Sequence, residues 1–235
     1  MAKVLGIIPA RGGSKGIPNK HTRKLAGKSI LARAAKTAFE SGVIDRLILS
    51  SNDAEIIGEA KKHNIETPFV RPAELAQDET AMLPVLQHAV EAFEDGGWQP
   101  EIIVLLQATA PIRKAEHIRM AVKKLIESKA DSVVSVIEIP HLFAPQKALK
   151  KGSEGLEFWV SGGGEITRRQ QLEKSYAREG TVYAFWRATL MEADSIYGEN
   201  CQPLVLDGEE SLTLDSESDW NAAVNILATQ KKEHE

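Results

Sequence analysis

Residues 4–20 read VLGIIPARGGSKGIPNK, and this stretch decides the fold because it joins an apolar run to a glycine-rich, cationic loop. The run at 4–8 is too short for a helix and rich in β-branched residues, which predicts a buried strand of a parallel sheet that ends at Pro9. The loop contains these glycines and cations: Gly12, Gly13, Gly16, Arg11, Lys15, Lys20 and Lys24. Glycines let backbone N–H groups approach a ligand, and nearby cations attract anions. Because open α/β sheets bind nucleotides at the carboxyl end of the first strand, the expected ligand is a polyphosphate.

Two common phosphate-binding motifs do not fit this loop. A Walker A loop requires G-x-x-x-x-G-K-[ST], but Gly16 follows Gly12 too closely and Ile17 occupies the lysine position. The dinucleotide fingerprint G-x-G-x-x-G is not matched either. The alternative to a phosphate site is a glycine-rich connector with solvated lysines.

Composition narrows the class of protein. The chain has 235 residues, which predicts a single domain over 1–235, and 43% hydrophobic residues are ordinary for a soluble globular protein. A net charge of −4 disfavours nucleic acid as a partner. The single cysteine, Cys201, excludes an intrachain disulfide and fits a reducing cytoplasm. No apolar run reaches the length of a membrane span, so no membrane partner is expected.

The order of the predicted elements indicates an α/β fold of the Rossmann-like, doubly wound kind with a mostly parallel sheet. Strands are expected over 4–8, 46–51, 67–70, 102–107, 132–139, 181–186 and 203–206. Helices are expected over about 29–41, 53–63, 80–94, 114–128, 188–193 and 216–230, with Ser29 and Asp53 at two of their starts. The strand at 102–107 is the most apolar and should be central, with Gln107 at its carboxyl end, where ligands bind.

The character of the chain changes from about 140 to 175. Prolines, a lysine cluster and the glycines at 162–164 interrupt any steady period, and 158–160 is the one strand expected there. We interpret this segment as an insert, a hairpin arm that lies over the site or over a partner chain.

Four further blocks accompany the first loop in order: RPAELAQD at 71–78, LLQATAPIR at 105–113, RRQQL at 168–172 and LTLDSESD at 212–219. With IPARGGSKGIPNK at 8–20, they resemble the CMP-sialic acid synthetases (acylneuraminate cytidylyltransferases) over nearly the whole chain. The resemblance implies a fold of the nucleotide-diphospho-sugar transferase type. It also implies transfer of CMP from CTP to the anomeric hydroxyl of a nonulosonic (sialic-type) acid, with release of pyrophosphate. The implied assembly is a homodimer in which the inserted arm lies at the interface.

The nucleotide needs cations to hold its phosphates during in-line attack. Arg11 and Lys15 suit the triphosphate, while Lys20 is placed to reach a phosphate or the incoming group, and these are the catalytic candidates. The candidates for nucleotide binding are Ala10, Arg11, Gly12, Gly13, Ser14, Lys15, His21, Arg71, Asp78, Thr80 and Ala81. For Arg71 an ion pair with Glu74 or Asp78 is the alternative.

The acidic sugar needs cations of its own. By resemblance, Gln107 contacts the sugar, and Arg169 and Lys147 of the insert face its carboxylate across the dimer interface. Gln170 and Tyr183 complete this set, although a core position is an equal alternative for the tyrosine, and Arg168 competes with its neighbour. A bidentate guanidinium suits a carboxylate better than an ammonium does.

The metal candidate is Asp215, with Mg²⁺ as the expected ion and Mn²⁺ as its alternative. The family's D-x-D pair corresponds here to Thr213 and Asp215, so one carboxylate is a hydroxyl in this chain. Magnesium accepts one or two protein carboxylates and completes its shell with water and phosphate oxygens. Asp207, Glu217 and Asp219 are possible helpers, and a helix cap is the alternative role of Asp215.

Two other departures from the family pattern are His21, where asparagine is usual, and Glu179-Gly180, where Asn-Gly is usual. Two alternative functions therefore stay open. One is a nucleotidyltransferase for 3-deoxy-octulosonate or for a sugar 1-phosphate. The other is a nucleotide-binding module that no longer catalyses. The sequence does not identify the particular nonulosonic acid.

Overall fold

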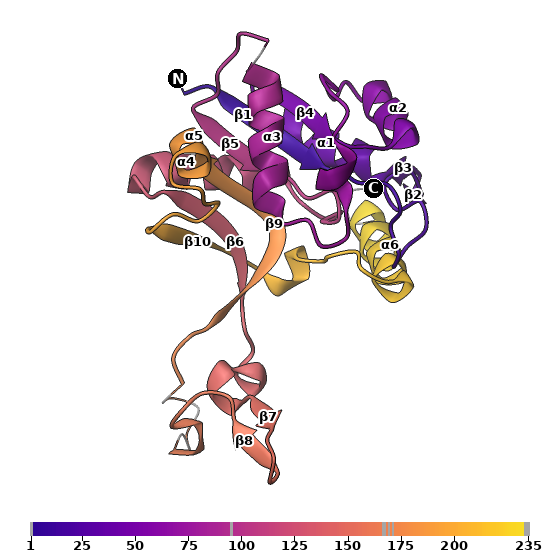
Figure 1. Ribbon diagram of the computed structural model, residues 1–235. Helices are drawn as coiled ribbons and strands as arrows, with labels where there is room; N and C mark the ends of the chain where they lie inside the picture. Colours follow the sequence, from indigo (N-terminus) through magenta and orange to yellow (C-terminus); the bar gives the residue numbers. More distant parts are fainter. Residues whose placement is uncertain (1, 95, 166–167, 169, 171, 233–235) are drawn as a thin grey trace.

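A mixed six-stranded sheet forms the centre of the molecule, in a computed structural model that describes residues 2–94, 96–165, 168, 170 and 172–232 (Figure 1). In spatial order the strands are β10 (Cys201–Leu206), β6 (Ser132–Glu138), β9 (Tyr176–Trp186), β5 (Ile102–Leu105), β1 (Val4–Pro9) and β4 (Arg46–Ser50). β1 is parallel to both β4 and β5, and β10 is parallel to β6, whereas β9 runs antiparallel to β5 and β6. The predicted mostly parallel sheet is confirmed.

Helices cover both faces of this sheet, as the doubly wound prediction requires. They are α1 (Ile30–Ser41), α2 (Ala54–Lys62), α3 (Met82–Glu94), α4 (Ala115–Ser128), α5 (Arg187–Met191) and α6 (Glu217–Lys232). One buried apolar cluster joins the sheet to α1, α4 and α6, and a second joins it to α3 and α5. In the described part of the chain, no helix has the length and apolar character needed to cross a membrane.

The helix boundaries follow from the capping residues that the sequence indicates. Ser29 begins α1 by accepting a hydrogen bond from the Ala32 N–H, and Gly42 ends it in the left-handed conformation (φ 67°). Asp53 begins α2 by accepting from the backbone N–H groups of Glu55 and Ile56. These caps explain why α1 and α2 lie close to their predicted positions.

The predicted strand at 67–70 is wrong. Glu66 makes a single bridge to Ile48 of β4, and the chain then leaves the sheet, so that Val70 is 65% exposed. Pro68 and Pro72 lack the N–H groups that a further ladder would need, which explains why pairing stops. The third strand of the first half is β5, on the other side of β1.

Two further differences concern turns and strand length. A small hairpin, β2 (Lys24–Leu25) and β3 (Lys28–Ser29), was not predicted; its turn residues Ala26 and Gly27 have positive φ angles of 47° and 83°. β9 begins at Tyr176, well before the expected position 181, because it pairs with the far end of β6.

The described residues of 139–175, called the arm below, project from the sheet beyond the ends of β6 and β9 (Figure 1). The arm contains the antiparallel hairpin β7 (Leu149–Lys151) and β8 (Leu156–Phe158) and short 3₁₀ turns. The strand expected at 158–160 thus overlaps only the end of β8. The role of the arm at a dimer interface stays a prediction.

Candidate active site

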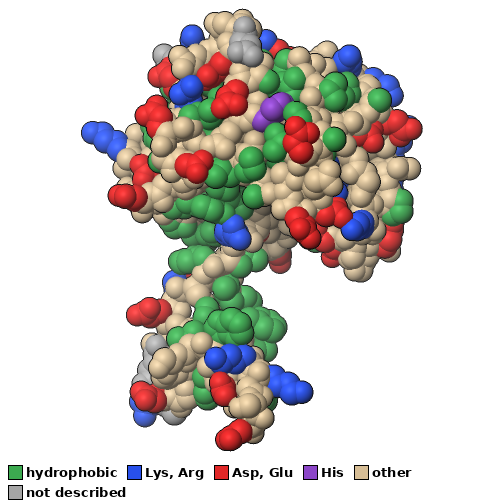
Figure 2. Space-filling model, in the orientation of Figure 1, with side chains coloured by type: hydrophobic (Ala, Val, Ile, Leu, Met, Phe, Trp, Pro, Cys, Tyr) green, Lys and Arg blue, Asp and Glu red, His purple; other side chains and the backbone are tan. Residues whose placement is uncertain are grey.

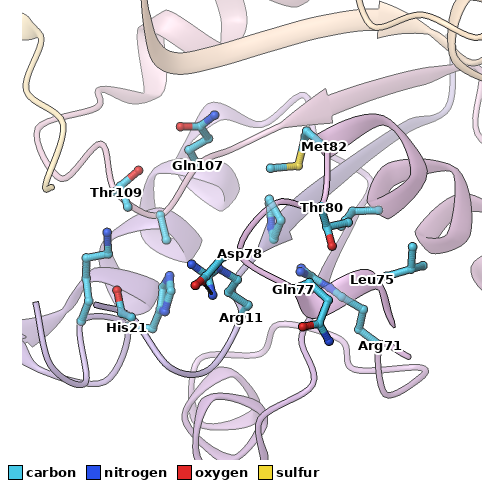
Figure 3. A pocket seen from close by; sticks show the side chains of 15 residues that line it. Arg11, His21, Arg71, Leu75, Gln77, Asp78, Thr80, Met82, Gln107 and Thr109 are labelled. Atoms are coloured by element: carbon cyan, nitrogen blue, oxygen red, sulfur yellow. Dashed lines mark ion pairs between the residues drawn. The ribbon is translucent and has the colours of Figure 1, made fainter. Parts of the chain in front are cut away.

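A pocket of about 250 Å³ opens where the carboxyl ends of β1 and β5 meet the loops that follow them (Figure 3). The first loop contributes Arg11, Ser14, Lys20 and His21, the segment after β4 contributes Arg71, Asp78 and Thr80, and the loop after β5 contributes Gln107. A second pocket of about 200 Å³ shares the four first-loop residues and adds Gly12 and Gly13. The structure therefore brings most of the predicted nucleotide-binding residues together. Ala10 is buried, Ala81 and Lys15 are exposed, and none of the three lines these pockets.

Asp78 joins two of the catalytic candidates. Its carboxylate forms an ion pair with Arg11 at 2.5 Å and another with Lys15. The hydrogen bond from Lys15, followed by the bond and charge of Arg11, holds the pKa of Asp78 below its usual value. Figure 3 shows Arg11 and Asp78 together in the pocket, between His21 and Arg71. Both cations are therefore paired with a carboxylate in this structure.

Arg71 is 5% exposed and is held by Ser50 rather than by Glu74 or Asp78, so the alternative ion pair is wrong. Its Nε donates to the Ser50 hydroxyl at 2.9 Å, and its Nη2 donates to the Ser50 carbonyl. Burial, reinforced by the charge of Arg11, lowers the pKa of Arg71 to about 10. The fixed guanidinium still carries its charge at neutral pH and contributes to an electropositive wall.

The surroundings of His21 and Lys20 lower the pKa of both side chains. Burial and then the charge of Lys20 lower the pKa of His21 to about 4, so its ring is neutral near pH 7. Burial also lowers the pKa of Lys20, while Asp215 opposes this shift. The Lys20 ammonium donates to the backbone carbonyl of Leu214 at 2.8 Å. The first loop is thereby tied to the segment that contains the metal candidate.

Gln107 lies just beyond β5 and lines the pocket, where its amide is close to Gly180. A Cβ at position 180 would lie 2.7 Å from Gln107 Oε1, and the φ of Gly180 is 84°, so this position requires glycine. Tyr183 lines neither pocket of the first loop; it is 5% exposed within β9 and packs edge-on against Tyr197. The core alternative is therefore the one that the structure shows for this tyrosine.

The remaining sugar-site candidates belong to the arm. Lys147 ends a 3₁₀ turn of the arm and Gln170 is exposed there, away from the residues that line the pocket. Arg169 lies outside the described residues.

The carboxylates of the predicted helpers of Asp215 have hydrogen-bond or ion-pair partners, and that of Asp219 accepts from the Asp215 N–H at 3.0 Å. Asp219 and Ser216 cap α6 reciprocally: Asp219 Oδ2 accepts from the Ser216 N–H at 2.7 Å, and Ser216 Oγ accepts from the Asp219 N–H. Asp207 accepts from the Glu209 N–H, and Glu217 pairs with Arg23. The carboxylate of Asp215, which is exposed, is not the helix cap.

A metal ion would find few ligands in the protein alone. Thr213 donates its hydroxyl proton to the backbone carbonyl of Glu179 at 3.0 Å. Among the described residues, no group of three or more His, Cys, Asp or Glu side chains could hold a metal ion. The single carboxylate of Asp215 fits an ion that takes its other ligands from phosphates and water.

Sequence reasoning missed several residues of the pocket, among them Gln77, Met82 and Thr109. Gln77 and Thr109 lie inside the quoted blocks 71–78 and 105–113, so the blocks carried a signal that residue-by-residue assignment did not use. Met82 opens α3, and its apolar side chain gave no sign of a ligand contact.

Solved structures of nucleotidyltransferases share this α/β fold. The solved structure of CMP:2-keto-3-deoxy-manno-octonic acid synthetase complexed with CTP has a TM-score of 0.74, covers 97% of this chain and 100% of that one, and is 13% identical. A 4-diphosphocytidyl-2C-methyl-D-erythritol synthase has a TM-score of 0.65, with 97% and 99% coverage and 14% identity. At these identities the likeness shows the fold.

Sequence comparison supplies the family. The profile of the cytidylyltransferase family matches residues 5–212, and the chain belongs to this family of nucleotidyltransferases. It is 30% identical to the post-translational flagellin modification protein B of Campylobacter coli, over 98% of this chain and 97% of that protein. It is 30% identical to the pseudaminic acid cytidylyltransferase of Campylobacter jejuni (serotype O:2), over 87% of each. It is 29% identical to the CMP-N,N'-diacetyllegionaminic acid synthase of Legionella pneumophila, over 96% of each.

Proposed function

We propose that this enzyme transfers CMP from CTP to the anomeric hydroxyl of a nonulosonic acid and releases pyrophosphate. The observation that carries the proposal is the convergence of Arg11, Lys20 and Arg71 around one pocket that also contains Gln107. Lys15 is joined to this pocket through its ion pair with Asp78. The relatives named as pseudaminic and legionaminic acid enzymes favour a nonulosonic acid over a sugar 1-phosphate.

The residues present account for the chemistry. Arg11 and Lys15 exchange the carboxylate of Asp78 for the triphosphate, so the loop binds phosphates without rearranging its cations. The neutral ring of His21 offers hydrogen bonds beside them without adding charge. Gln107 orients the sugar so that its hydroxyl attacks the α-phosphate in line.

Magnesium is the proposed cofactor. Asp215 would hold it together with phosphate oxygens, and a bound Mg²⁺ neutralises the charge that develops on the phosphates. Lys20 beside Asp215 keeps this carboxylate next to the phosphate loop, which supports the assignment. A location in the cytoplasm, predicted from the single cysteine, also stays a prediction.

A homodimer completes the proposed assembly. The arm exposes large apolar side chains, with exposed fractions of 64% for Leu142, 69% for Phe143, 72% for Leu156 and 68% for Trp159. Figure 2 shows hydrophobic side chains gathered on the arm. Such a patch fits a contact with a second copy, whose arm would supply Lys147 and Arg169 to the sugar carboxylate. Trp159→Glu should convert a dimer into a monomer in analytical ultracentrifugation; a natural protein that sediments as a monomer would refute the assembly.

The decisive assay measures pyrophosphate release from CTP and Mg²⁺ with a panel of pseudaminic, legionaminic, N-acetylneuraminic and 3-deoxy-octulosonic acids. Release that depends on one acid identifies the substrate. Lys15→Ala should reduce this rate, whereas Lys28→Ala, on the exposed hairpin β2–β3, is the matched control. Release with 3-deoxy-octulosonate alone, or with none of the acids, would refute a nonulosonic acid substrate.

The second candidate, a nucleotide-binding module without catalysis, rests on Thr213. It predicts CTP binding without pyrophosphate release, and activity that appears only in Thr213→Asp. In the structure this hydroxyl bonds to a carbonyl, a partner that an aspartate could not keep because both groups are acceptors. We therefore expect Thr213→Asp to disturb the segment rather than to restore a ligand.

A further inference from the structure

Glu179 is a buried carboxylate that does not line the nucleotide pocket. It is 8% exposed, and its oxygens accept three hydrogen bonds. The backbone N–H of Thr181 donates to Oε1 at 2.9 Å, and the hydroxyl of Thr181 donates to Oε2 at 2.6 Å. The third donor, at 3.0 Å, is the hydroxyl of Ser211, from a distant part of the chain. A charge buried in this way is stable only while its partners stay in place.

Residues 211–215, called the 211–215 segment, are fixed by Glu179 and by two loops of the site. Ser211 bonds to the Glu179 carboxylate and Thr213 to its backbone carbonyl, both at 3.0 Å. The fully buried Leu214 donates its N–H to the Thr109 carbonyl at 2.9 Å and accepts from Lys20. The position of Asp215, the next residue, follows from these bonds.

Arg113 bonds to Thr181, which is also a partner of Glu179, and to Gln107, the residue proposed to contact the sugar. Its Nε donates to the Thr181 carbonyl at 2.6 Å, and its Nη2 donates to the carbonyl of Gln107. Its Nη1 is buried without a hydrogen-bond partner in the part of the chain that the structure describes. Burial lowers the pKa of Arg113 to about 10, and the charge of Glu179 opposes this shift. Both residues bond to Thr181, Arg113 to its carbonyl and Glu179 to its N–H and hydroxyl, so this residue links them.

We infer that Arg113 and Glu179 form a positioning pair that sets Gln107 and the 211–215 segment relative to each other. The inference rests on the proposed function, in which Gln107 meets the sugar and Asp215 the metal. Neither member of the pair touches a reactant. Through Thr181, the pair couples Gln107 to the 211–215 segment. Removal of the Glu179 carboxylate should therefore displace both.

The test compares Glu179→Ala, Glu179→Gln and Ser211→Ala with the control Glu91→Ala, an exposed residue of α3. For Glu179→Ala we expect the requirement for Mg²⁺ and the KM for the sugar acid to rise together, each roughly 10- to 100-fold, as is typical when a supporting partner is lost. The Kd of CTP without Mg²⁺ should not change. Glu179→Gln keeps an oxygen acceptor and should recover part of the loss.

Ser211→Ala separates the effect on the 211–215 segment from the effect on Gln107. It removes the bond to the segment and leaves Thr181 and Arg113 in place, so the Mg²⁺ requirement should rise while the KM for the acid stays unchanged. Equal effects of Ser211→Ala on both parameters, or unchanged parameters in Glu179→Ala and Glu179→Gln, would overturn the inference.

Hydrogen exchange gives a readout that needs no turnover. In the protein without ligands, the Leu214 amide should exchange faster in Glu179→Ala and Ser211→Ala than in the control, because its segment has lost a fixed partner. If CTP chemistry is absent but exchange changes as stated, the proposed function fails and the structural coupling stands. Unchanged exchange at Leu214 would refute the coupling itself.

Discussion

Gly16→Ala should separate the phosphate loop from the 211–215 segment. An ideal Cβ at position 16 would lie 2.1 Å from the backbone carbonyl oxygen of Asp215, far below any real Cβ contact. A backbone carbonyl cannot change rotamer as a flexible side chain can. The phosphate loop and the 211–215 segment must therefore move apart by about 1 Å. Overpacking of this kind costs about 1–3 kcal/mol. For a domain of this size that corresponds to a fall in Tm of roughly 2–12 °C.

The effect on activity should exceed the effect on stability. Lys20 bonds to the carbonyl of Leu214, next to Asp215, and a displacement of about 1 Å can cost on the order of 100-fold in rate. The assay is pyrophosphate release with CTP, Mg²⁺ and the preferred acid, alongside thermal unfolding. The control is Gly58→Ala, where the added Cβ meets nothing within 4 Å. A Gly16→Ala enzyme with the natural rate and Tm would refute the reasoning.

Gly58→Ala itself should raise the free energy of unfolding by about 0.5–1 kcal/mol, because glycine inside a helix is entropically costly; no gain in chemical denaturation would contradict this. The pKa of His21 falls from 6.5 to about 4 on folding, so its contribution to stability is complete above pH 6.5 and is lost as pH falls to about 4. This loss amounts to about 3 kcal/mol. His21→Asn should therefore lose less stability between pH 7 and pH 4 than the natural protein, and equal losses would show that the ring is not responsible. Asp78→Asn should bind CTP more tightly than the natural protein, because the carboxylate competes with phosphate for Arg11 and Lys15. The difference should be larger at low salt than at high salt. Weaker binding by the variant would indicate that Asp78 contacts the nucleotide directly.

Much of the fold could be predicted because its signals are local. Ser29, Gly42 and Asp53 fix helix ends through bonds within a few residues, and the apolar runs of β1 and β5 show their burial directly. The false strand at 67–70 has strand-like residues, but Pro68 within it and Pro72 just after it cannot donate to a ladder. The early start of β9 depends on pairing with β6, a partner far away in sequence.

The candidate site also contains residues that the sequence could predict and residues that it could not. The cations of the first loop could be predicted because one short stretch contains them. The role of Glu179 could not, because it depends on a serine thirty-two positions away, and the choice between the two alternatives for Tyr183 depends on its ring neighbour. The cap formed by Ser216 and Asp219 is local, but the sequence analysis did not assign it. Thr213 was visible as a departure, but only the structure shows what its hydroxyl binds.

β9 is a single strand that leaves the arm at Tyr176 and reaches the middle of the sheet, passing Gly180 beside Gln107 on the way. A displacement of the arm can therefore shift the backbone of this strand at the place where the sugar is proposed to bind. In the proposed homodimer, thermodynamic reciprocity then requires that an acid which tightens the contact between two arms is itself bound more tightly by the dimer. Diluting the enzyme through its dissociation range should weaken its apparent affinity for the acid, and a concentration-independent affinity would show that the strand does not transmit this displacement.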